Sequence, residues 1–100
     1  MNPRIELIYS PHCPNVEFAR GRIVEALKIV GRAPSWVEWN RESPVAPEHA
    51  RLYGSPTILV DGRDVVGAPA SLVDNCRVYA SGSGFDRAPP LQVLLDALGG

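Results

Sequence analysis

Apolar residues along this chain form short runs with two different spacings. Residues 4–9 are mostly apolar, which predicts a strand buried at the centre of a sheet. From Val16 to Val30, apolar residues recur at every third or fourth position, which predicts an amphipathic helix that stops at Gly31. Residues 35–40 are rich in strand-forming residues and predict a second strand. This order of strand, helix and strand predicts a right-handed βαβ unit, in which the two strands are parallel.

The middle of the chain predicts a short helix followed by a hairpin. Residues 46–53 could form a short helix that begins at Pro47 and is closed by Gly54. Residues 55–60 and 63–67 both have strand-like patterns. The Asp-Gly pair between them, at positions 61 and 62, is a strong signal for a tight turn that joins antiparallel strands.

The rest of the chain predicts an irregular segment and a final helix. Residues 68–90 contain serine, glycine and proline in no regular pattern, with a short helix expected around residues 70–79. Residues 91–98, entered by Pro90, predict the last helix. With a length of 100 residues, we expect a single domain over residues 1–100, formed by one mixed four-stranded sheet with helices on both faces.

The composition and net charge of the chain limit the kinds of binding partner to expect. Hydrophobic content of 45% and charged content of 21% are typical of soluble globular proteins. The net charge of -1 gives no electrostatic reason to expect nucleic acid or an anionic membrane as a partner. No segment has the pattern of a signal peptide or the roughly 20 apolar residues of a membrane span. We therefore expect a cytoplasmic protein, and the oligomeric state stays open.

The chain has two cysteines, Cys13 and Cys76. They are too few for a disulfide framework, and in a reducing compartment both start as thiols. The two histidines, His12 and His49, do not complete any recognisable metal-ligand spacing with them. The sequence therefore predicts no resident metal and no cofactor.

Cys13 occupies a chemically favourable position, because it lies where the first strand passes into the first helix. Unpaired backbone N–H groups at a helix N-terminus stabilise a thiolate and lower the pKa of the cysteine. Pro14 suits the first helical turn, where its missing N–H costs nothing. His12 is expected to be a solvated loop residue that would favour the thiolate if protonated. From these residues alone, Cys13 could be reactive or inert.

Two local motifs resemble the thioredoxin-like and glutaredoxin-like superfamily. The first is Cys13-Pro14-Asn15-Val16, at the place of the Cys-X-X-Cys motif of that family, and the second is Tyr53-Gly54-Ser55-Pro56-Thr57, which resembles its cis-proline segment. The phrase from Leu7 to Glu17 also resembles a group of small bacterial proteins associated by name with organomercurial (alkylmercury) lyases. These residues give no basis for assigning carbon–mercury cleavage.

The resemblance implies a thioredoxin-like fold. Its mixed four-stranded sheet would have the order 2-1-3-4 and be flanked by three helices, with an extra loop before the last helix. The resemblance also implies a cis-Pro56 beside Cys13 and a Ser55 backbone that pairs with a peptide or thiol substrate. The residues expected to contact substrate are His12, Pro14, Ser55, Pro56 and Thr57.

The chain departs from the family at the second cysteine, which is replaced by Val16. We expect thiol–disulfide exchange in which Cys13 forms a mixed disulfide with a protein or a low-molecular-weight partner. An external thiol, or Cys76 if its Cα can come within about 7 Å of that of Cys13, would resolve it. Two alternatives stay open: binding of a thiophilic ion such as Hg(II) or Cu(I) by both cysteines, and a non-catalytic interaction module that holds a peptide near Pro56.

Overall fold

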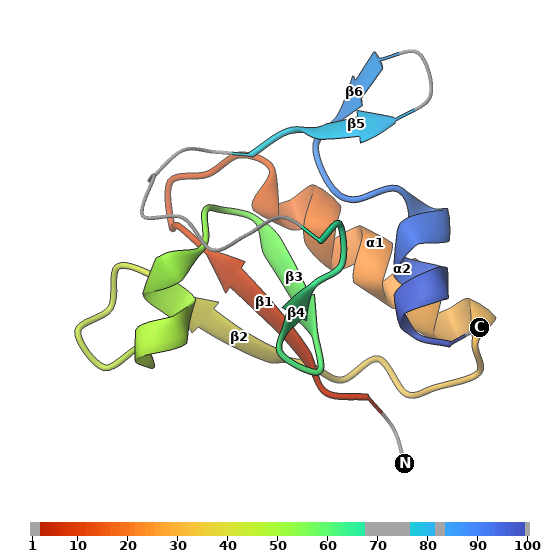
Figure 1. Cartoon of the computed structure of the whole chain (residues 1–100), viewed down its shortest axis with the longest axis horizontal. Coiled ribbons are helices and arrows are strands. Elements are labelled where there is room, and N and C mark those ends of the chain that lie inside the picture. Colours follow the sequence, from red (N-terminus) through yellow and green to blue (C-terminus); the bar gives the residue numbers. More distant parts are fainter. Residues whose placement is uncertain (1–2, 68–76, 82–83, 100) are drawn as a thin grey trace.

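The computed structural model describes residues 3–67, 77–81 and 84–99 (Figure 1). Its elements are, in chain order, β1 (Ile5–Tyr9), α1 (Val16–Ile29), β2 (Val37–Asn40), the 3-10 helix η1 (Glu48–Leu52), β3 (Thr57–Val60), β4 (Arg63–Asp64), β5 (Tyr79–Ser81), β6 (Gly84–Asp86) and α2 (Leu91–Ala97).

The first four strands form one mixed sheet in the order β2-β1-β3-β4, as predicted. β2 runs parallel to the central β1, whereas β3 runs antiparallel to it and to β4. Asp61 and Gly62 join β3 to β4 with φ angles of 52° and 81°. A two-residue turn with two positive φ values matches the twist of a hairpin, which explains why the Asp-Gly pair predicts it correctly.

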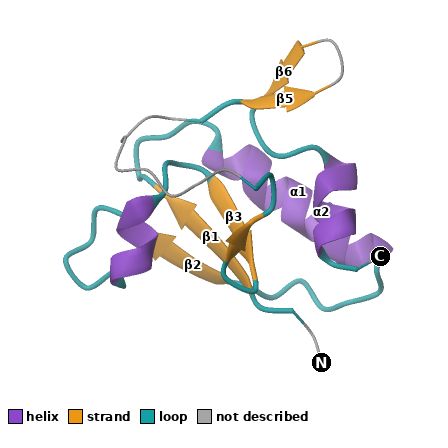
Figure 2. Cartoon of the chain, in the orientation of Figure 1, coloured by secondary structure: helices purple, strands orange, loops and turns teal. Residues whose placement is uncertain are grey.

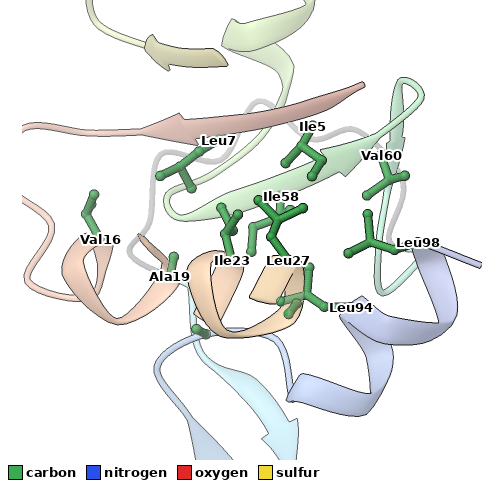
Figure 3. Packing of buried hydrophobic residues seen from close by; sticks show 12 residues of the cluster. Ile5, Leu7, Val16, Ala19, Ile23, Leu27, Ile58, Val60, Leu94 and Leu98 are labelled. Carbon is green, nitrogen blue, oxygen red and sulfur yellow. The ribbon is translucent and has the colours of Figure 1, made fainter. Parts of the chain in front are cut away.

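Both α-helices cover the same face of this sheet (Figures 1 and 2). Because side chains alternate along a strand, Ile5 and Leu7 of β1 point toward α1 and α2. Figure 3 shows the two helices closing over these strand residues, with Leu27 and Leu94 meeting between the helices. This cluster of buried apolar residues is the main core of the protein.

The opposite face of the sheet has a much smaller apolar cluster. It contains the buried residues Ile8, Ala50 and Leu59, with Trp39 packed at its edge. η1 lies over this face and contributes only Ala50 to the buried set. Trp36 packs instead against the main core, so the two tryptophans lie on opposite faces of the sheet.

Two predictions about the elements need correction, and a third lies mostly outside the described residues. The described residues contain two α-helices rather than three, because the helix expected over residues 46–53 is the five-residue 3-10 helix η1. Its segment lies between Pro47 and Gly54 and buries one small side chain, which is too little to support a longer α-helix. Of the short helix expected near residues 70–79, positions 70–76 lie outside the described residues, and Tyr79 begins a strand. The segment expected to be irregular also contains the hairpin of β5 and β6.

Candidate functional site

The antiparallel pairing of β1 and β3 brings two loops together. Ile8, near the end of β1, pairs with Thr57, the first residue of β3. The loop that leaves β1 toward Cys13 therefore lies beside the loop that enters β3 through Ser55 and Pro56. A hydrogen bond from the Ser10 backbone N–H to Ser55 Oγ, 2.9 Å long, joins these two loops.

The Ser55–Pro56 peptide bond is cis, as the resemblance implies. Ser55 is buried, and the Thr57 hydroxyl donates a 2.7 Å hydrogen bond back to the Gly54 carbonyl. These contacts fix the direction of the Ser55 carbonyl group, which points to the side on which Cys13 lies. Of the predicted substrate-contacting residues, Ser55, Pro56 and Thr57 thus form one buried wall of the site.

Cys13 lies in the turn between β1 and α1 and is partly exposed. Its backbone N–H donates a 3.1 Å hydrogen bond to the Ser10 carbonyl, and its Sγ lies 3.6 Å from the Ser55 carbonyl oxygen. The sulfur is in the disulfide state. Cys76, the second predicted catalytic residue, lies outside the described residues. His12 and Pro14, the other two predicted contact residues, are exposed on either side of Cys13.

The start of α1 differs slightly from the expectation. Asn15 is the N-cap and its carbonyl accepts the Ala19 N–H at 3.2 Å, so Pro14 precedes the helix rather than occupying its first turn. Cys13 is therefore two residues before the N-cap, at the positive end of the helix dipole. Val16, which stands at the position of the family's second cysteine, is buried in the main core.

The Asn15 side chain does not cap its own helix. Its Nδ2 instead donates a 3.1 Å hydrogen bond to the Arg77 carbonyl, 62 residues further along the chain. The Arg77 backbone N–H donates to the Ser55 carbonyl, the same oxygen that lies beside Cys13 Sγ. The chain before β5 therefore touches both loops of the site.

The Arg77 side chain anchors this segment in a largely buried polar network. Its Nη1 lies 2.7 Å from Thr57 Oγ1 and 2.7 Å from Asp64 Oδ2, and the Asp64 side chain is only 1% exposed. The guanidinium also stacks on the Tyr79 ring, with 4.6 Å between Cζ and the ring centroid. The Tyr79 hydroxyl donates to the Pro56 carbonyl, and burial raises the pKa of this hydroxyl above its usual range. No pattern in the sequence singled out Arg77, because its partners come from β3, β4 and β5.

A second polar cluster, also missed from the sequence, lies on the other face of the sheet. Glu6 is buried in β1, where its Oε2 lies 2.7 Å from both Trp39 Nε1 and His49 Nε2. The contact between His49 and Glu6, together with the edge-on packing of His49 against Trp39, attaches η1 to the sheet. A cavity of about 470 Å³ lies beside the cluster and is also lined by Arg4.

Other features of the described residues bear on the remaining predictions. They contain no group of three or more His, Cys, Asp or Glu side chains that could hold a metal ion. The predicted two-thiolate metal site needs Cys76 and so lies outside the described residues. No helix in the described ranges is long and apolar enough to cross a membrane.

No protein-family model, curated protein or solved structure matches this chain.

Proposed function

We propose that the protein has a thioredoxin-like fold and catalyses thiol–disulfide exchange with Cys13 as the nucleophile. The observation that carries the proposal is the position of Cys13 Sγ, which lies before the N-terminus of α1 and 3.6 Å from the carbonyl oxygen that precedes cis-Pro56. The sheet order β2-β1-β3-β4 with α1 between its two parallel strands agrees with that fold.

The electrostatics of this position act in two directions. The positive end of the α1 dipole favours the thiolate of Cys13. In the reduced protein, the Ser55 carbonyl oxygen, which lies 3.6 Å from Sγ, favours the thiol, because it is placed to accept a hydrogen bond from S–H and repels a negative sulfur. The proposed chemistry requires the helix to dominate, so that the Cys13 thiol has a pKa below the reference of about 8.5.

The proposed reaction transfers two electrons. The Cys13 thiolate attacks one sulfur of a disulfide RS–SR′, which forms Cys13–S–SR and releases R′S⁻. The Cys76 thiolate then attacks the Cys13 sulfur and releases RS⁻, so that the substrate is reduced and the protein carries a Cys13–Cys76 disulfide. Two low-molecular-weight thiols, or one dithiol, return the protein to the reduced form and leave as a disulfide.

Two observations support Cys76 as the resolving residue. Cys13 is in the disulfide state, and Cys76 is the only other cysteine in the sequence. The neighbour of Cys76 in the chain, Arg77, donates its backbone N–H to the carbonyl oxygen that lies beside Cys13 Sγ.

The test is the pH dependence of thiol alkylation in reduced Cys76→Ser and reduced Cys13→Ser, each carrying one cysteine. We expect Cys13 to react with an apparent pKa at least about one unit below that of the same cysteine in the urea-unfolded chain. The wild type, treated with one equivalent of a small disulfide, should lose two hydrogens by mass spectrometry and retain no adduct. A mixed disulfide that persists on Cys13 would show that Cys76 does not resolve it, and the resolving role would pass to an external thiol.

An apparent pKa for folded Cys13 at or above that of the unfolded chain would overturn the proposed function. In that case the interaction module becomes the better interpretation. Tight, stoichiometric Hg(II) or Cu(I) binding that is lost in either single-cysteine variant, combined with no disulfide exchange in the wild type, would favour the metal-binding alternative.

A further inference from the structure

The backbone of Arg77 occupies the surface next to the Cys13 sulfur. Its N–H donates to the Ser55 carbonyl, and its own carbonyl accepts a hydrogen bond from Asn15 Nδ2. Both backbone groups of this one residue are thus paired with residues that flank Cys13. An extended polypeptide laid against Ser55 would pair its own backbone N–H with this carbonyl oxygen, which Arg77 already occupies.

The contacts of the Arg77 side chain make it difficult to displace this residue from the surface next to Cys13. The guanidinium is held by Asp64, whose carboxylate is almost fully buried, and by the hydroxyl of Thr57. Withdrawal of Arg77 would leave the buried Asp64 carboxylate without its arginine partner, which is strongly unfavourable. A polypeptide substrate would have to displace the whole segment, whereas a small disulfide needs access only to the sulfur of the partly exposed Cys13.

We infer that Cys13 reacts with low-molecular-weight disulfides and discriminates against disulfides carried on extended polypeptides, with Arg77 as the residue that determines this specificity. This inference rests on the proposed function and adds the class of substrate to it. The step remains attack of the Cys13 thiolate on one sulfur, with formation of a mixed disulfide and departure of the other sulfur as a thiolate.

The test compares two probes with the same leaving group. Both are 2-pyridyl disulfides, one of 2-mercaptoethanol and one of an extended heptapeptide with a central cysteine, and both release pyridine-2-thione. Reduced full-length Cys76→Ser supplies the thiol. The ratio of the two second-order rate constants, small probe over peptide probe, is divided by the same ratio for that chain unfolded in urea.

We expect this normalised ratio to be about tenfold or more in the folded Cys76→Ser protein, which is equivalent to roughly 1.4 kcal/mol. Adding Arg77→Gln, or Asp64→Asn from the other side of the pair, should bring the ratio close to one. Adding Arg87→Gln is the matched control, because Arg87 is exposed and stacks on Phe18 rather than on the site. This control should keep the tenfold ratio.

The outcomes separate this inference from the proposed function. A small probe that reacts no faster with folded than with unfolded Cys76→Ser would overturn the proposed function. A fast small probe with a normalised ratio near one would overturn only the discrimination against polypeptides. A high ratio that persists in the folded Arg77→Gln variant would show that Arg77 does not cause the discrimination. The ratio in Cys76→Ser alone decides the substrate class even if the Arg77 and Asp64 variants do not fold.

Discussion

Glu6 is a charged side chain in the middle of an otherwise apolar central strand. Its carboxylate is 6% exposed and accepts hydrogen bonds from Trp39 and His49, with Arg4 close to its other oxygen. Burial raises the pKa of this carboxyl, but the two hydrogen bonds and the neighbouring charges outweigh burial and hold the pKa below its usual value. Glu6 therefore stabilises the fold as a carboxylate.

The first prediction concerns Glu6→Gln. Because the pKa of Glu6 is lowered in the folded state, its stabilisation is complete above the unfolded value of about 4.3 and is lost as the pH falls through the folded value. We expect the free energy of unfolding to decrease less between about pH 5 and pH 3 in Glu6→Gln than in the wild type. Urea denaturation at a series of pH values measures this difference.

The matched control for this prediction is Glu25→Gln, since Glu25 is exposed on α1. Its acid dependence should follow that of the wild type. Equal acid dependence in Glu6→Gln and the wild type would show that the hydrogen bonds to Glu6 do not stabilise the carboxylate over the protonated form.

At the scale of single residues, the sequence predicted the two loops that carry Cys13 and Pro56, but it did not predict the contribution of Arg77. Cys13, Ser55 and Pro56 were found because they belong to two local motifs, and the structure places them together. Arg77 was missed because its importance comes from partners that are distant in sequence, such as Asn15 and Asp64. A lone arginine in an irregular segment has the same local pattern as a solvated one.

At the scale of elements, two glycines differ in whether their backbone conformation requires glycine. Gly21 lies in the middle of α1, and a Cβ built on it would meet nothing within 4 Å. Gly62 lies in the turn from β3 to β4 with a φ of 81°, a conformation that residues with a Cβ rarely adopt. The same substitution should therefore have opposite effects at the two positions.

The second prediction uses this pair. Gly21→Ala should raise the free energy of unfolding by about 0.5–1 kcal/mol, because alanine has the better helix propensity and space is available. Gly62→Ala should lower it by about 1 kcal/mol, because the turn forces the new side chain into a strained conformation. Chemical denaturation of both variants measures the two shifts. A loss of stability in Gly21→Ala would indicate that α1 requires glycine at this position for a reason other than the helix itself.

The four strands of the main sheet and both α-helices were predicted to within a few residues. By contrast, η1 was predicted in a different form, and β5 and β6 were not predicted. α1 and β1 have long, regular apolar patterns that few other structures would satisfy. η1 is held by contacts between His49 and Glu6 and by burial of Ala50, none of which a local pattern encodes. Short helices depend on what they pack against, so their type is decided by their neighbours.

At the scale of the whole molecule, stability is concentrated on one face of the sheet. α2 completes this face, and its Leu94 is almost fully buried against the cluster that includes Leu27 and Val60 (Figure 3). The last described segment of the chain is therefore needed to close the core whose first members come from β1. Among the described residues, the opposite face holds only a small apolar cluster and a polar network.

The third prediction tests this arrangement. Leu94→Ala should lower the free energy of unfolding by about 2–5 kcal/mol, because it removes buried methyl groups and leaves a cavity. Val45→Ala is the control at an apolar position that is 88% exposed, and it should change stability by no more than about 0.5 kcal/mol. Equal, small effects from the two substitutions would mean that α2 does not contribute to the cooperative core.

The sequence by itself determined the order of the four main-sheet strands and the two α-helices, the hairpin at Asp61-Gly62 and the position of Cys13 before a helix. These features follow from local periodicity, turn chemistry and two short motifs. Only the tertiary structure decided that Glu6 is buried, that η1 is a 3-10 helix and that Arg77 occupies the surface beside Cys13. Each of these depends on hydrogen bonds between residues far apart in the chain, and such bonds exist only after the sheet has brought their partners together.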